Sequence, residues 1–88
     1  MFNPAIATGE TRLPRNVTPK QVFSLGMMHS TGQSMPLDLV SAHKWFNIAA
    51  MLGMKDAVRL RNEVAAEMTT AEIAAAQRAA CDWLKTRH

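Results

Sequence analysis

The sequence predicts an all-α protein of four helices, on the basis of three observations. Apolar residues recur at spacings of three and four in four successive segments. These segments are separated by residues that often begin or end helices, such as Thr-Pro, Asp and Gly. No run of β-branched residues alternates with polar ones, so no strand is expected. With 88 residues, 48% of them hydrophobic, the chain is expected to fold as one domain.

The first helix is expected to follow an N-terminal arm. Residues 1–17 contain two prolines and a glycine and lack periodicity, which predicts a flexible arm ahead of a helical domain over residues 18–88. Thr18 is a candidate N-cap, and the proline that follows it suits a first helical turn. The helix is expected to end near Gly32, and its inward face holds Val22, Leu25, Gly26 and His29.

The second helix is expected to pack on more than one side. Asp38 can cap its N-terminus, and Gly53 is expected to end it. Its apolar residues cover so much of the circumference that a single neighbour would leave part of them exposed. They are Leu39, Ala42, Trp45, Phe46, Ile48, Ala49, Ala50 and Leu52.

The third and fourth helices are expected to form a second antiparallel pair. The third begins near Lys55 or Asp56 and carries a narrower apolar stripe of Ala57, Leu60, Val64 and Met68. Thr69 and Glu72 then form the pattern of a capping box, which predicts the start of the fourth helix. Almost no linker separates the two, so they are expected to fold back on each other. The fourth helix turns inward Ile73, Ala76, Ala80, Trp83 and Leu84.

A spaced set of small and aromatic residues runs through the first hairpin into the third helix. It consists of Leu25, Gly26, Gly32, Asp38, Ala42, Trp45, Ala49, Ala50, Gly53 and Ala57. The set resembles a Sel1-like repeat, a relative of the tetratricopeptide repeat. His29 departs from that pattern, which usually has Tyr there, and Ser34 stands where a second Gly is common. Independently of the family, Gly26 is expected to let the second helix approach the first closely.

The resemblance implies a scaffold or adaptor that binds other proteins without catalysis, built here from a single repeat. The segment from Met68 onward looks like the closing helix that often follows a terminal repeat in bacterial members. Stacked repeats normally need about three units for stability. Because one unit leaves the side before the first helix uncovered, the chain is expected to self-associate or dock a partner there, through Val22, Phe23 and Met27.

Methionine usage gives a second hint of a binding surface. The chain has seven methionines, and Met side chains adapt their shape to varied partners. Met51 and Met54 fall near the polar stripe of the second helix, so they join the candidate partner-binding residues.

Other functions have weaker support. Nucleic-acid binding is the alternative, because the net charge is +3 and Lys55, Arg59 and Arg61 share the third helix, but basic residues are otherwise scattered. No metal or cofactor is expected, because His29 and His43 have no ligand at metal-binding spacing. His29 is expected to be packed, His43 to lie at the surface, and Cys81 to be a buried, inert thiol. Without a secretory pattern or a stretch of ~20 apolar residues, a cytoplasmic protein with no membrane contact is expected.

Overall fold

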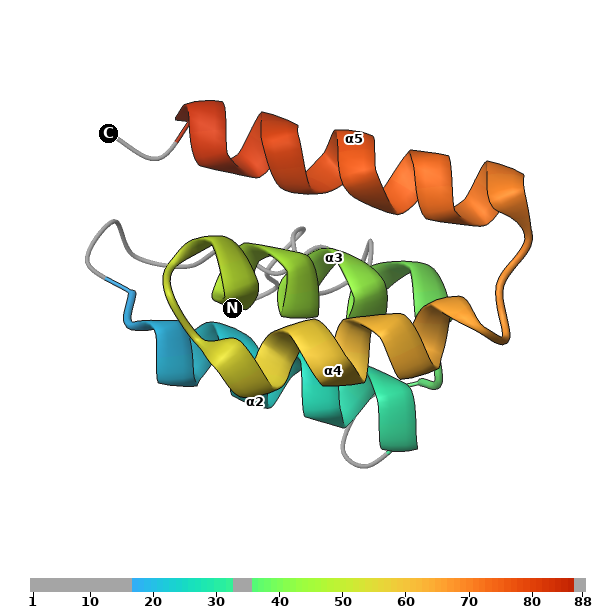
Figure 1. Cartoon of the computed structure of the whole chain (residues 1–88), viewed down its shortest axis with the longest axis horizontal. Helices are drawn as coiled ribbons and strands as arrows, with labels where there is room; N and C mark the ends of the chain where they lie inside the picture. The colour runs from blue at the N-terminus through green and yellow to red at the C-terminus, as the bar shows by residue number, and fades with distance from the viewer. Residues whose placement is uncertain (1–16, 33–35, 87–88) are drawn as a thin grey trace, which may run out of the picture.

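Four helices make up the part of the chain that the computed structural model describes, residues 17–32 and 36–86. They are α2 (Pro19–Thr31), α3 (Leu39–Met51), α4 (Lys55–Ala65) and α5 (Thr70–Thr86) (Figure 1). No strand occurs within those ranges, so the predicted all-helical class is confirmed there. The predicted arm, except for its last residue, and Ser34 lie outside the described residues.

The expected caps fix where the helices begin and end. At the start of α2, the Thr18 hydroxyl accepts from the backbone N–H of Gln21 at 3.2 Å, and the Gln21 side chain accepts from that of Thr18 at 2.8 Å. At the start of α3, Asp38 accepts from the Ser41 N–H at 3.1 Å. The C-cap of α2, Gly32, has a φ of 76°, a left-handed conformation that favours glycine.

A capping box also separates α4 from α5, as predicted. The backbone N–H of Thr69 donates to the Glu72 carboxylate at 2.8 Å, and the N–H of Glu72 donates to the Thr69 hydroxyl at 3.1 Å. Both interactions satisfy N–H groups that the first turn of α5 would otherwise leave without partners.

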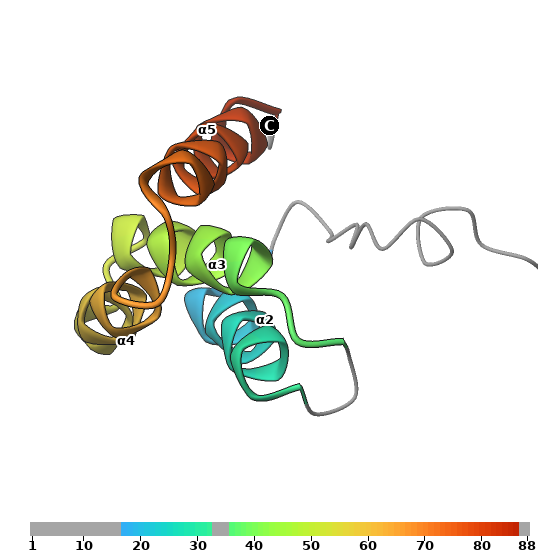
Figure 2. The same ribbon diagram turned by 90° about the vertical axis from the view of Figure 1, so that its right-hand side faces the viewer.

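Helix α3 lies at the centre of the molecule. Figure 2 shows α2 and α4 on one side of it and α5 on the other. Seven of its residues are buried, which confirms that it packs on more than one side: Ala42, His43, Trp45, Phe46, Asn47, Ile48 and Ala49. These contacts hold the other helices in place, since α2, α4 and α5 all pack against α3.

Helix α5 packs against α3, so the prediction that it forms a pair with α4 is wrong. The two run in opposite directions (Figure 1), but the main contacts of α5 are with α3. The rings of Trp45 and Trp83 meet edge to face, with centroids 5.9 Å apart. Ala76 and Ala80 are fully buried and allow a close approach. The narrow inward stripe of α4 is itself packed against α3, which leaves α5 no apolar face on α4 to cover.

Val17 belongs to the folded body, although it was expected in the arm. Its side chain is only 5% exposed and lies in the core cluster that contains Val22 and Leu25. Because it is apolar and directly precedes the α2 cap, it closes the end of the hairpin core. The folded domain therefore starts at least one residue earlier than predicted.

Candidate protein-binding surface

Val22 cannot contribute to a binding surface in this structure. Its side chain is fully buried, in the core cluster with Leu25 and Trp45. Spacings of three and four place it on the same face of α2 as Leu25 and Gly26, which is the face turned to α3. The prediction that Val22 docks a partner is wrong, because α3 already occupies that face.

Phe23 and Met27 form a smaller apolar surface on α2 than was predicted. The Phe23 ring is half-buried, with its centroid 5.5 Å from that of Phe46 at an angle of 57°. Met27, one turn later, is 38% exposed. The rest of the outer face of α2 is polar and includes Lys20, Gln21, Ser24 and Thr31. Helix α2 thus offers one exposed methionine beside the edge of a packed ring.

Met51, Met54 and Val58 form a second apolar surface at the turn between α3 and α4, which we call the turn patch. Met51 is 54% exposed and Val58 is 39% exposed, whereas Met54 is half-buried. Sequence reasoning found the two methionines and missed Val58. Its position outside the buried stripe of α4 would have revealed it, because an apolar residue off that stripe faces solvent.

The two apolar surfaces lie on different flanks of α4. Val58 and Arg61 are three residues apart on one flank, and the Arg61 guanidinium reaches α3, where it donates to the Asn47 side-chain oxygen at 3.0 Å. Leu60 lies on the other flank and packs in the same cluster as Phe23. The structure therefore does not unite the predicted partner-binding residues in one site.

His29 and His43 are both buried, at 7% and 3% exposure. The packed position of His29 agrees with expectation, but the surface position expected for His43 is wrong, because α3 is covered on nearly all sides. The Nδ1 atom of each ring has no hydrogen-bond partner. Burial lowers the pKa of His43, and the nearby positive charge of Arg61 lowers it further. Across the described residues, no three His, Cys, Asp or Glu side chains gather as a metal site would require.

Cys81 is exposed on α5, which corrects the prediction of a buried thiol. Helix α5 fully buries only the narrow face of Ala76 and Ala80, and Cys81, the residue after Ala80, lies outside that face. The alanines around it in the sequence suggested burial, but many of them are partly exposed themselves.

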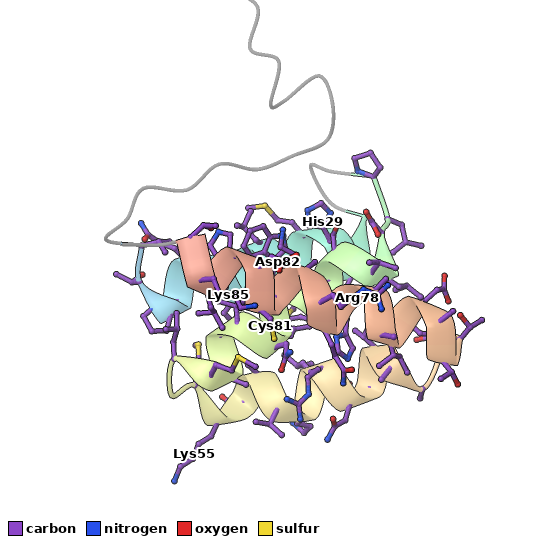
Figure 3. The ribbon with its side chains drawn as sticks, turned by 90° about the horizontal axis from the view of Figure 1, so that it is seen from above. His29, Lys55, Arg78, Cys81, Asp82 and Lys85 are labelled. Atoms are coloured by element: carbon purple, nitrogen blue, oxygen red, sulfur yellow. The ribbon has the colours of Figure 1, made fainter. Side chains whose placement is uncertain are left out.

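The basic residues of α4 do not form a continuous cationic surface. Arg59 pairs with Glu63 at 2.8 Å, and Arg61 is bonded to Asn47. Lys55 projects away from the body into solvent (Figure 3). The described residues carry almost balanced charge, with Lys20, Lys44, Lys55, Arg59, Arg61, Arg78 and Lys85 against Asp38, Asp56, Glu63, Glu67, Glu72 and Asp82.

Comparisons with models of known families, with characterised proteins and with solved structures gave no significant match. Within the described part of the chain, no helix has the length and apolar character to cross a membrane.

Proposed function

We propose that this chain is a small, non-catalytic protein–protein interaction module, a scaffold or adaptor of the Sel1-like type. The packing of the residues that carry the resemblance supports the proposal. Most of them lie in the core: Leu25, Gly26, Ala42, Trp45, Ala49 and Ala57 are buried. Gly32 and Gly53 have φ values of 76° and 103°, which only glycine adopts at little cost.

The exposed turn patch is the observation that carries the proposal. Single exposed apolar residues are ordinary on protein surfaces, but adjacent large ones often mark interaction sites. Met51 ends α3 and Val58 lies in the first turn of α4, so they stand on either side of the turn between these helices, and both are well exposed. Methionine also suits a surface that must fit a partner, because its unbranched side chain can change shape. The surface proposed for the partner is therefore the turn patch, with Met27 on α2 as a second, smaller contact.

An affinity capture from native extract, with a chemical cross-linker, tests the proposal. The variant M51D/V58D removes the apolar character of the turn patch at two exposed positions, so the fold should tolerate it. Met27→Asp probes the α2 surface in the same way. Phe23→Asp is unsuitable, because it would place a carboxylate against the Phe46 ring in the core.

Arg78→Glu, an exposed change on α5, is the matched control. We expect a set of partners that the wild type and Arg78→Glu capture and that M51D/V58D loses. Identical partners for all four proteins would contradict a role for either surface.

Nucleic-acid binding through Lys55, Arg59 and Arg61 is the second candidate, favoured by the exposed position of Lys55. Two observations weaken this candidate. Arg59 is paired with Glu63, and the charge of the described residues is nearly balanced. Binding to random duplex DNA that falls steeply with rising salt, and that Lys55→Glu weakens, would support this candidate over the first.

A further inference from the structure

We draw no further inference here: the strongest candidate, the exposed apolar surface of Met51 and Val58 at the turn between α3 and α4, belongs to the site already described, and nothing in the described part of the structure shows what covers it.

Discussion

The Phe46 ring of α3 lies directly against Gly26 of α2. A Cβ atom added to Gly26 would come within 2.6 Å of two ring carbons, closer than real side chains approach. The glycine therefore sets the distance between the two helices, and the ring fills the space that a side chain at this position would take. Phe46 is fully buried and also meets Phe23, so it cannot move aside without disturbing a second contact.

Gly26→Ala should destabilise the protein, although alanine is ordinarily the better helix residue. The gain in helix propensity is about 1 kcal/mol, whereas overpacking a tight core costs roughly 1–3 kcal/mol. We expect a net loss of about 1 kcal/mol in the free energy of unfolding, measured by urea denaturation. In a Phe46→Leu background the same change should cost less, because the ring that it strikes is gone. Equal costs in both backgrounds would mean that the ring does not limit the approach.

Asp38→Ala should weaken the start of α3. The Asp38 carboxylate accepts from the Ser41 backbone N–H and also from its hydroxyl, the latter at 2.8 Å. Loss of such a cap costs about 1 kcal/mol. Asp38→Asn should retain most of the stability at neutral pH, since an amide oxygen still accepts from the N–H. Urea denaturation of the two variants measures the difference, and equal losses would show that the charge rather than the cap matters.

The lowered pKa of Asp38 makes part of the stability of the fold depend on pH in acid. Burial acts to raise this pKa, but the hydrogen bonds from Ser41 and the charge of His29 outweigh it and hold the pKa below its ordinary value of 3.8. A lowered folded-state pKa gives stability that is present above 3.8 and is lost as the pH falls through the folded value. Asp38→Asn should lack this part of the acid unfolding.

Sequence reasoning predicted the local features of the fold well. The caps at Thr18, Asp38 and Thr69 and the C-cap at Gly32 depend on a residue and its neighbours within four positions, so their types and spacing suffice. The broad apolar circumference of α3 also predicted correctly that several elements pack around it.

The features that sequence reasoning missed depend on how whole helices pack. The side of α3 that holds His43 is buried by the packing of other helices against it, and no pattern around His43 indicates this. The alanines of α5 suggested burial for Cys81, because their periodicity does not show which side faces α3. Val22 was predicted at the binding surface since no residue before it seemed able to cover α2, yet α3 covers the face on which it lies.

Trp83→Ala should loosen α5 more than the rest of the molecule. The edge-to-face contact with Trp45 and the small face of Ala76 and Ala80 hold α5 to α3, and α4 adds little. Since Trp83 is half-buried, we expect a loss of about 2 kcal/mol, below the range for a fully buried aromatic. The substitution should increase the rate of amide hydrogen exchange in α5 more than in α2 and α3, as expected for a unit that opens separately. Trp83→Phe should keep most of the protection, and uniform quickening in all helices would contradict separate opening.

Mild acid should destabilise the fold through His43. Its ring is buried in α3, its Nδ1 has no hydrogen-bond partner, and the Arg61 guanidinium repels the protonated form. Its pKa in the folded chain is therefore lower than the ordinary value of 6.5. As the pH falls below that value, the unfolded chain binds the proton first, so stability declines until the pH passes the folded pKa.

His43→Gln keeps a polar side chain but removes the titration, so comparison with the wild type isolates this effect from the other histidines. Urea denaturation between about pH 7.5 and about pH 5.5 should show a larger loss of unfolding free energy for the wild type than for His43→Gln. Arg61→Gln should give an intermediate pH dependence, because it removes the repulsion and leaves the burial. A wild type and a His43→Gln variant with parallel pH profiles would mean that water reaches His43 and that α4 does not seal this side of α3. The pH profile therefore measures how tightly α4 closes on α3, next to the turn patch that the proposed function needs exposed.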